Sequence, residues 1–297
     1  MIIYQYAKIN SMTPQQYCQD KINDGSSRYY SLRFLPTAQQ KTLTALHAFY
    51  HEVSEIRYEC HDTDVARVKF QWWQEEIAQT FAGTPHHPVC QVLSEPIRYY
   101  QLAEHYFQEI IEGWRRDFDV TRYATFEDLE GYCKRTSSVL NLLCTQVLGY
   151  KNDSTLKYAE QLGIALQLTY ILRELRRDIK NGRFYIPQEE LVRFKVSKQS
   201  LFDGQLSQTL QALFAHQTTR IRAYSNNAFK YLAKEDRFNQ RCGLIRAQLA
   251  LATLQEIEND GYQILKHKIR LTPLRKLWIT WHTGWQARGW FGSTYFK

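Results

Sequence analysis

The sequence has no long apolar run, although 44% of its 297 residues are hydrophobic. No stretch approaches about 18 uncharged apolar residues, so we expect no membrane-spanning helix. Residues 1–6 show neither a basic segment nor an apolar core, and we therefore expect no secretory signal peptide. The six cysteines are far apart and never form a Cys-x-x-Cys pair, which favours a reducing, cytoplasmic compartment over a disulfide framework.

Strand signals are also scarce, because alternating Val, Ile and Thr residues are almost absent. Asp62 and Thr125 have the form of helix N-caps, and a polar stretch follows Pro187. We find no repeat and no interdomain linker, so the sequence predicts one all-α domain of antiparallel helices over residues 1–297. Helical periodicity runs through residues 37–59, 129–148, 154–180, 206–232 and 235–266.

Positive charge is in excess. The chain has 38 Lys and Arg residues against 30 Asp and Glu residues, for a net charge of +8. Such an excess favours an anionic partner. The basic residues are dispersed among acids and form no recognisable binding motif, so we expect no nucleic acid partner. A diphosphate group or an anionic membrane surface would use the same charge.

Two acids on one predicted helix are the first candidates for a site. Glu174 and Asp178 are four residues apart, so they share one helix face, and Tyr170 lies one turn earlier. Carboxylates in this arrangement offer the hard oxygen ligands that Mg²⁺ prefers. The same spacing also fits a solvated helix face on which the acids pair with basic neighbours. Those neighbours are Arg173, Arg176 and Arg177.

The flanking residues extend this pattern over residues 167–187. Gln-Leu-Thr precedes the acids, and Gly-Arg-x-Tyr-x-Pro follows them at 182–187. In this form the segment resembles the second aspartate-rich helix of the squalene/phytoene synthase family, the head-to-head prenyltransferases. Residues 49–59 stand where that family carries Asp-Asp-x-x-Asp. The resemblance covers nearly the whole chain and implies a single-domain, isoprenoid-synthase-type helical bundle around a central cavity.

In that family two acid-bearing helices hold Mg²⁺ across the cavity, and the metal neutralises the diphosphate leaving group as its C–O bond breaks. Here the resemblance keeps Glu174 and Asp178 as candidate metal ligands. Tyr170 replaces an asparagine of the family, and Arg177 replaces a glutamate. The arginine would pair with the acids and repel a cation.

The first helix departs further from the family. Ser54 and Tyr58 stand at the two metal-binding aspartates, and His51 stands at an arginine. Neutral hydroxyl groups are poor replacements for carboxylates on Mg²⁺. Glu55 and Glu59 remain as candidate ligands, but they are turned roughly 100° from the face that the family uses.

Five further residues are candidates for binding a diphosphate by this resemblance. Residues 25–36 are similar to the segment in which family hydroxyls contact the substrate diphosphate, which gives that role to Ser27. The family's phenylalanine after that serine is Arg28 here, and an arginine can grip phosphate. Arg173, Arg183 and Tyr185 complete the candidate set.

Residues 132–143 match a helix that carries Ala-Gly-x-Val-Gly in the family. Those glycines let an isoprenoid tail lie close to the backbone. Ser138 and Asn141 replace them here, so we expect both side chains to line the cavity and to narrow or plug it.

A transition-metal site is an alternative for the first helix. His47, His51 and Glu55 fall at i, i+4 and i+8 and could hold zinc. The sequence offers no evident fourth ligand, and helical histidines are more often hydrogen-bonded core or surface groups.

Residues 273–297 form an aromatic and basic C-terminal segment. Basic residues with interfacial tryptophans suit a helix that lies on a membrane surface, and a final helix docked on the core is the alternative. The residues concerned are Arg275, Lys276, Trp278, Trp281, Trp285, Trp290 and Phe291.

The sequence therefore predicts a prenyltransferase-family protein that is weak or inactive as a catalyst, with no assignable catalytic residue. It would act as a scaffold that binds an isoprenoid diphosphate, another lipid or a protein, in the cytoplasm or peripherally on the inner face of a membrane. The alternative is an active enzyme that condenses two farnesyl or geranylgeranyl diphosphates to squalene or phytoene precursors. Mg²⁺ is the expected cofactor only in that case.

Overall fold

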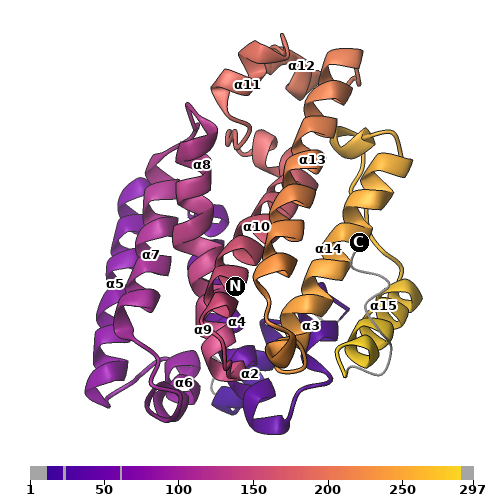
Figure 1. Ribbon diagram of the computed structural model, residues 1–297. Helices are drawn as coiled ribbons and strands as arrows, with labels where there is room; N and C mark the ends of the chain where they lie inside the picture. Colours follow the sequence, from indigo (N-terminus) through magenta and orange to yellow (C-terminus); the bar gives the residue numbers. More distant parts are fainter. Residues whose placement is uncertain (1–11, 23–24, 61, 289–297) are drawn as a thin grey trace.

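Helices build nearly all of the part of the chain that the structure describes. The computed structural model describes residues 12–22, 25–60 and 62–288. An isolated parallel bridge between Arg122 and Phe184 is the only strand-like pairing in these residues, so the predicted all-α class is confirmed. The elements are α2 (Pro14–Asp20), α3 (Ser27–Leu32), α4 (Thr37–Glu59), α5 (Thr63–Ala82), α6 (Pro88–Tyr99), α7 (Glu104–Asp119), α8 (Phe126–Cys133), η1 (Lys134–Ser138), α9 (Val139–Leu148), α10 (Ser154–Lys180), α11 (Gln188–Arg193), α12 (Lys198–Asp203), α13 (Gln208–Tyr231), η2 (Lys234–Asp236), α14 (Arg241–Asn259), η3 (Gln263–Leu265) and α15 (Pro273–Gln286) (Figure 1).

Local capping explains where several helices begin. The Asp62 carboxylate accepts hydrogen bonds from the backbone N–H groups of Asp64 and Val65 and so caps α5. Thr125 and Asp128 form a capping box at the start of α8. These caps satisfy backbone donors that have no partner within the helix, which is why their sequence patterns predict helix starts well.

The central helix of the bundle is α10. It packs against α13 and also contacts α9, η1 and α14 (Figure 1). Its close approach to η1 requires Gly163, because a Cβ atom built there would lie only 2.3 Å from the Cα of Ser138. This contact anchors α10 well before the turn that carries Glu174 and Asp178.

Three stretches differ from the sequence-based expectation. The helix expected over residues 235–266 is divided into η2, α14 and η3. The helix predicted over residues 129–148 is interrupted by a π-helical turn, η1, between α8 and α9. The polar stretch after Pro187 contains two short helices, α11 and α12. Six-residue helices of this kind carry too little periodicity to be read from sequence.

The core contains the aromatic and sulfur-containing side chains that helical periodicity placed there. All six cysteines are buried and unpaired, including Cys18, Cys133 and Cys144. Trp73 is buried, as a packing role requires, whereas its neighbour Trp72 is 43% exposed and lies edge-on against Trp73. Among the described helices, none is long and apolar enough to cross a membrane.

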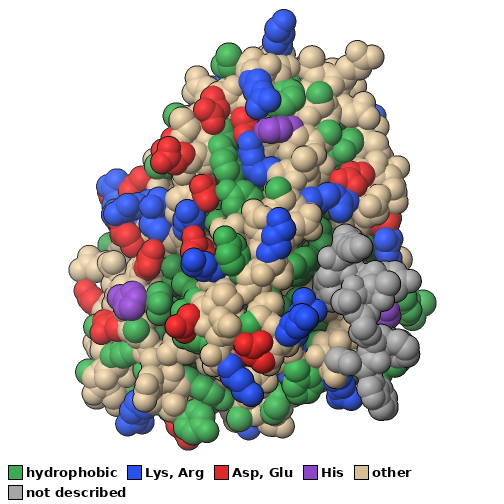
Figure 2. All heavy atoms as spheres, viewed as in Figure 1, with side chains coloured by type: hydrophobic (Ala, Val, Ile, Leu, Met, Phe, Trp, Pro, Cys, Tyr) green, Lys and Arg blue, Asp and Glu red, His purple; other side chains and the backbone are tan. Residues whose placement is uncertain are grey.

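Charges of both signs are mixed on the face shown in Figure 2. On α7, for example, Arg115 and Arg116 both pair with Glu112, at 2.6 and 2.7 Å. The positive excess of the chain is therefore not gathered on this face, and its concentration elsewhere becomes clear in the pocket described next.

Candidate functional site

A pocket of about 520 Å³ lies between α3, α4, α10, α14 and the segment that follows α14. A second hollow of about 450 Å³ adjoins it and shares residues of α10 with it. Eight Lys and Arg side chains line the larger pocket, against two acids, Glu55 and Glu174. The pocket is therefore strongly electropositive. The basic residues are Lys21, Arg28, Arg173, Arg177, Arg246, Lys268, Arg270 and Lys276.

Glu174 is already paired with cations of the chain itself. It is 4% exposed, and Lys268 Nζ lies 2.5 Å from Oε1 and 2.7 Å from Oε2. Arg173 Nε donates to Oε1 at 3.0 Å, and Arg177 Nε lies 3.8 Å from Oε2. Burial opposes ionisation, but the hydrogen bond from Lys268 and the charges of Arg173, Lys268 and Arg177 hold the pKa of Glu174 below its ordinary value.

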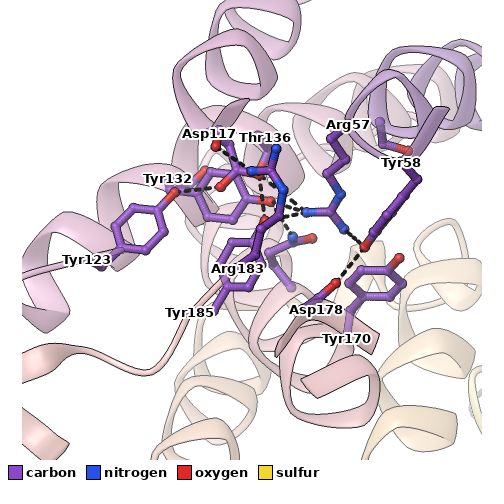
Figure 3. Close-up of polar contacts among 12 residues, drawn as sticks. Arg57, Tyr58, Asp117, Tyr123, Tyr132, Thr136, Tyr170, Asp178, Arg183 and Tyr185 are labelled. Atoms are coloured by element: carbon purple, nitrogen blue, oxygen red, sulfur yellow. Dashed lines mark hydrogen bonds and ion pairs between the residues drawn. The ribbon is translucent and has the colours of Figure 1, made fainter. Parts of the chain in front are cut away.

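Asp178, one turn further along α10, is in a different environment. It is fully buried, and its Oδ1 accepts a hydrogen bond from the Tyr58 hydroxyl at 2.8 Å (Figure 3). Its Oδ2 has no hydrogen-bond partner among the described residues. Burial raises the pKa of Asp178, although Arg57, Arg177 and the Tyr58 hydroxyl act in the opposite direction. Asp178 does not line the pocket.

Arg177 spans the gap between α10 and α4. Its Nη2 donates to the hydroxyls of Tyr58 at 2.7 Å and of Tyr170 at 2.6 Å, and its guanidinium lies 4.1 Å from the centre of the Tyr58 ring. Two tyrosines, one on α4 and one on α10, thus hold the guanidinium of Arg177 between these helices.

A buried network joins α4 to α7 and to the residues after α10 (Figure 3). Arg57 pairs with Asp117 at 3.3 Å and donates to the hydroxyls of Tyr58 and Tyr185. The Tyr185 hydroxyl donates to Asp117 Oδ2 at 2.6 Å, and that of Tyr123 donates to Oδ1 at 2.8 Å. The pair between Arg57 and Asp117 is buried, and removing either partner would leave a charge in a poorly solvated environment.

This network corrects the prediction for Arg183 and Tyr185. Both were candidates for binding a diphosphate, but neither lines the pocket. Arg183 is buried and donates to the backbone carbonyl of Asp117 at 2.7 Å. Sequence reasoning missed Asp117 and Arg57, although each falls on a buried face of its helix, Asp117 three residues after buried Trp114.

The other candidates on α3 and α4 divide between the pocket and the surface. Ser27, Arg28, Ser54 and Glu55 line the pocket. Glu59 is exposed and lies 3.4 Å from Lys69, outside the pocket lining. The predicted four-acid set is therefore not brought together.

Ser138 and Asn141 also lie outside the pocket lining, contrary to the expectation that they narrow it. The Ser138 hydroxyl donates to the backbone carbonyl of Glu160 at 2.7 Å, within the contact between η1 and α10. Asn141 is buried, and its Oδ1 accepts a hydrogen bond from Arg246 at 3.1 Å. The neighbouring residues Ser137 and Leu140 face the pocket instead.

The donors present do not fit a bound metal. Within the described ranges, no group of three or more His, Cys, Asp or Glu side chains is placed to hold one, which removes the zinc site suggested by His47, His51 and Glu55. Burial, with Arg28 nearby, lowers the pKa of His51 to about 4, and its ring lies 3.8 Å from Glu55. For Mg²⁺, Glu174 would first have to release Lys268, and Asp178 would have to release Tyr58.

Comparison with known proteins agrees with the geometry of the fold. The sequence model described as squalene/phytoene synthase matches residues 23–276. The chain is 28% identical to the 15-cis-phytoene synthase of Synechococcus elongatus over 264 residues, covering 84% of this chain and 85% of the relative. It is 30% identical to the phytoene synthase of Mycobacterium tuberculosis over 258 residues, covering 84% and 82%.

Solved structures show the same fold. A dehydrosqualene synthase in complex with ligand superposes with a TM-score of 0.82 at 22% identity, covering 93% of this chain and 97% of the other. The squalene synthase HpnC from Alicyclobacillus acidocaldarius gives a TM-score of 0.73 at 21% identity, covering 84% and 94%.

Proposed function

Because this chain belongs to the squalene/phytoene synthase family, we propose that it keeps the lipid-binding pocket and has lost efficient Mg²⁺-dependent condensation. In this proposal the pocket binds an anionic isoprenoid, such as an isoprenoid diphosphate, through arginine and lysine side chains. The protein then acts as a lipid-binding scaffold at a membrane rather than as a synthase.

The observation that carries the proposal is the engagement of both acids of α10. Lys268 and Arg173 neutralise Glu174, and Tyr58 hydrogen-bonds Asp178 outside the pocket. Ser54 offers only a hydroxyl, which donates to the backbone carbonyl of His51. Removing one preorganised charge-stabilising group typically reduces catalytic rate by roughly 10²–10³. Several such groups are absent here, so ordinary turnover is not expected even if the effects are not additive.

Crowded cations supply the binding energy for an anion. Lys276 lines the pocket and donates a hydrogen bond to the backbone carbonyl of Gly25 at 2.7 Å. Among the described residues, it forms no hydrogen bond with an acid. Burial and the nearby Arg173 and Arg270 lower the pKa of Lys276. A diphosphate placed among these like charges would relieve their repulsion and accept charge-assisted hydrogen bonds.

An exposed apolar surface lies next to these cations on α15, and we propose that it faces a membrane. The helix is docked on α14 and α3, with Ile279 buried. Its outer face carries a stripe at i, i+3, i+4 and i+7, with Leu274 80% and Trp278 60% exposed. Because Lys276 of the same helix lines the pocket, a bilayer touching this stripe would sit close to the pocket and could deliver a lipid to it. The stripe consists of Leu274, Leu277, Trp278 and Trp281.

An active prenyltransferase is the second candidate. The observation that favours it is that Glu55 of α4 and Glu174 of α10 line the same pocket from facing helices. If a substrate displaced Lys268 from Glu174, these two carboxylates would be the available Mg²⁺ ligands.

One experiment separates the candidates. Purified protein is incubated with radiolabelled farnesyl or geranylgeranyl diphosphate, Mg²⁺ and NADPH, and a phytoene synthase serves as the positive control. In a parallel measurement, calorimetry gives the affinity for farnesyl diphosphate in the presence of Mg²⁺ or of EDTA. We expect farnesyl diphosphate to bind equally in both conditions and no condensation product to form. Cyclopropyl diphosphate or hydrocarbon product at a rate near that of the control would overturn the proposal, as would binding that EDTA abolishes.

A further inference from the structure

The inner wall of the pocket carries two arginines where a tail-binding wall is ordinarily apolar. Arg246 of α14 and Arg28 of α3 both line the pocket, together with Leu140, Leu166 and Ala250. Arg28 is partly buried, and Arg246 is better shielded from solvent than the outer cations of the pocket, Arg173 and Lys268. Arg246 is 9% exposed, whereas Lys268, beside Glu174, has a side chain that is 39% exposed.

Neither arginine has an acidic partner in the described part of the chain. Arg246 Nη1 donates to the amide oxygen of Asn141 at 3.1 Å, and Arg28 lies 5.4 Å from the centre of the Tyr50 ring. Asn141 and Tyr50 are both neutral. No ion pair between described residues involves the guanidinium of Arg28 or Arg246. A buried arginine normally pairs with an acid, because its charge is costly to remove from water.

His47 adds an unused polar group to the same region. Its side chain is fully buried, and neither ring nitrogen has a hydrogen-bond partner among the described residues. Burial, followed by the charges of Arg246 and Arg28, lowers the pKa of His47 well below its ordinary value. The same two guanidiniums repel each other. Burial is the main cause that lowers the pKa of Arg28, and the positive charge of Arg246 is the next. None of the three groups forms an ion pair with an acid among the described residues, and the two arginines line one pocket.

We propose that Arg28 and Arg246 form a second anion-binding subsite, which takes a carboxylate or phosphate at the end of the ligand remote from its diphosphate. This rests on the proposed function, because the outer cations must hold the first anionic group. The apolar side chains that line the same pocket, Leu166 and Ala250 among them, would contact the connecting chain. The ligand is thus a single, doubly anionic isoprenoid, and a pocket of about 520 Å³ suits one such molecule better than two long tails.

The test compares two ligands that differ only at the remote end. Calorimetry measures the affinity of geranyl diphosphate and of its analogue in which the terminal methyl group is oxidised to a carboxylate. Charge-assisted hydrogen bonds to these two guanidiniums should make the carboxylate analogue bind roughly tenfold tighter or more. Equal affinity of the two ligands for the wild-type protein overturns the subsite and leaves the proposed function intact. Failure of both ligands to bind overturns both proposals.

Variants then assign the preference to the residues. Arg246→Met and Arg28→Phe should each abolish the preference for the carboxylate analogue, measured as the ratio of the two affinities on the same variant. Arg33→Met is the matched control, because Arg33 is an exposed arginine at the end of the same helix as Arg28, and it should change neither affinity. Thermal melts verify that each variant is folded. A preference that survives in a folded Arg28→Phe variant contradicts the assignment, and the two-ligand comparison on the wild type stands without any variant.

Discussion

Asp178→Asn and Glu174→Gln should change stability in opposite directions, although the two acids lie one turn apart on α10. Asp178 is fully buried, accepts one hydrogen bond from Tyr58 and leaves Oδ2 without a partner. Glu174 is buried to a similar extent, but cations engage both of its oxygens. The environment, and not the residue type, therefore sets the sign of the effect.

For Asp178, burial raises the pKa in the folded state above its unfolded value. Ionisation then opposes folding, and this penalty is absent below the unfolded pKa of about 3.9 and complete above the folded pKa. Asp178→Asn keeps an acceptor for Tyr58 and removes the buried charge. We expect a gain of about 1 kcal/mol at pH 7, which corresponds to a rise in Tm of about 2 °C.

For Glu174, the pKa is held below its unfolded value despite burial, chiefly by Lys268 and Arg173. Its ionised form stabilises the fold above the unfolded pKa of about 4.3, and this contribution is lost as the pH falls through the folded pKa. Glu174→Gln should therefore lower the free energy of unfolding by about 1–2 kcal/mol at pH 7.

Urea and thermal unfolding of the wild type and both variants, at pH 7 and at about pH 4, test this reasoning. Both differences from the wild type should shrink at the lower pH as the carboxyl groups become protonated. Glu59→Gln is the control, since Glu59 is exposed, and it should have little effect. If Asp178→Asn lowers the free energy of unfolding by more than about 1 kcal/mol at pH 7, the argument is refuted. The carboxylate would then be a required counter-charge for Arg57.

Three further predictions test the pocket, the membrane surface and the buried network. Lys268→Met should weaken farnesyl diphosphate binding by roughly tenfold in calorimetry, and an unchanged affinity would remove Lys268 from the anion site. The double variant Trp278→Ala, Trp281→Ala should pellet less with anionic liposomes than the wild type does. Phe202→Ala removes an exposed aromatic side chain from α12 and should leave pelleting unchanged. Equal pelleting of all three proteins would contradict the membrane proposal. Arg57→Met should destabilise the protein by about 3 kcal/mol in urea, because it removes the nearer cation from buried Asp117 and leaves Arg183, at 3.7 Å, as its charged partner; a loss below about 1 kcal/mol would show that the network is dispensable.

Much of the helical scaffold was predictable, because the signals that define it are local. The helix expected over residues 37–59 has the same bounds in the structure, and the helix expected from Ser154 ends at Lys180. Asp62 and Thr125 cap helices as their sequence patterns indicate. The π-helical turn was not predictable, because its cause is tertiary: η1 packs against Gly163 of α10 and against α7.

The candidate site was less predictable, because its side chains are paired across long separations in sequence. Glu174 meets Lys268, which is 94 residues away, and Asp178 meets Tyr58, which is 120 residues away. Similarly, Arg183 turns toward Asp117 rather than toward the pocket. Spacing along α10 places two acids on one face, but only the packing of other helices decides which acid reaches the pocket.

The departures from the family motifs fit one another, which argues against a site that has merely decayed. An arginine between two carboxylate helices would need acceptors, and Tyr58 and Tyr170 supply hydroxyls at 2.7 and 2.6 Å to Arg177. Tyr58 also donates to Asp178 Oδ1, so one residue contacts both the cation and the acid of α10. Guanidinium groups can bind an anion without a metal, and they need no exchange of water ligands to do so. The proposed function rests on this change: the replacements would turn a wall suited to holding cations into one suited to holding anions directly, without Mg²⁺.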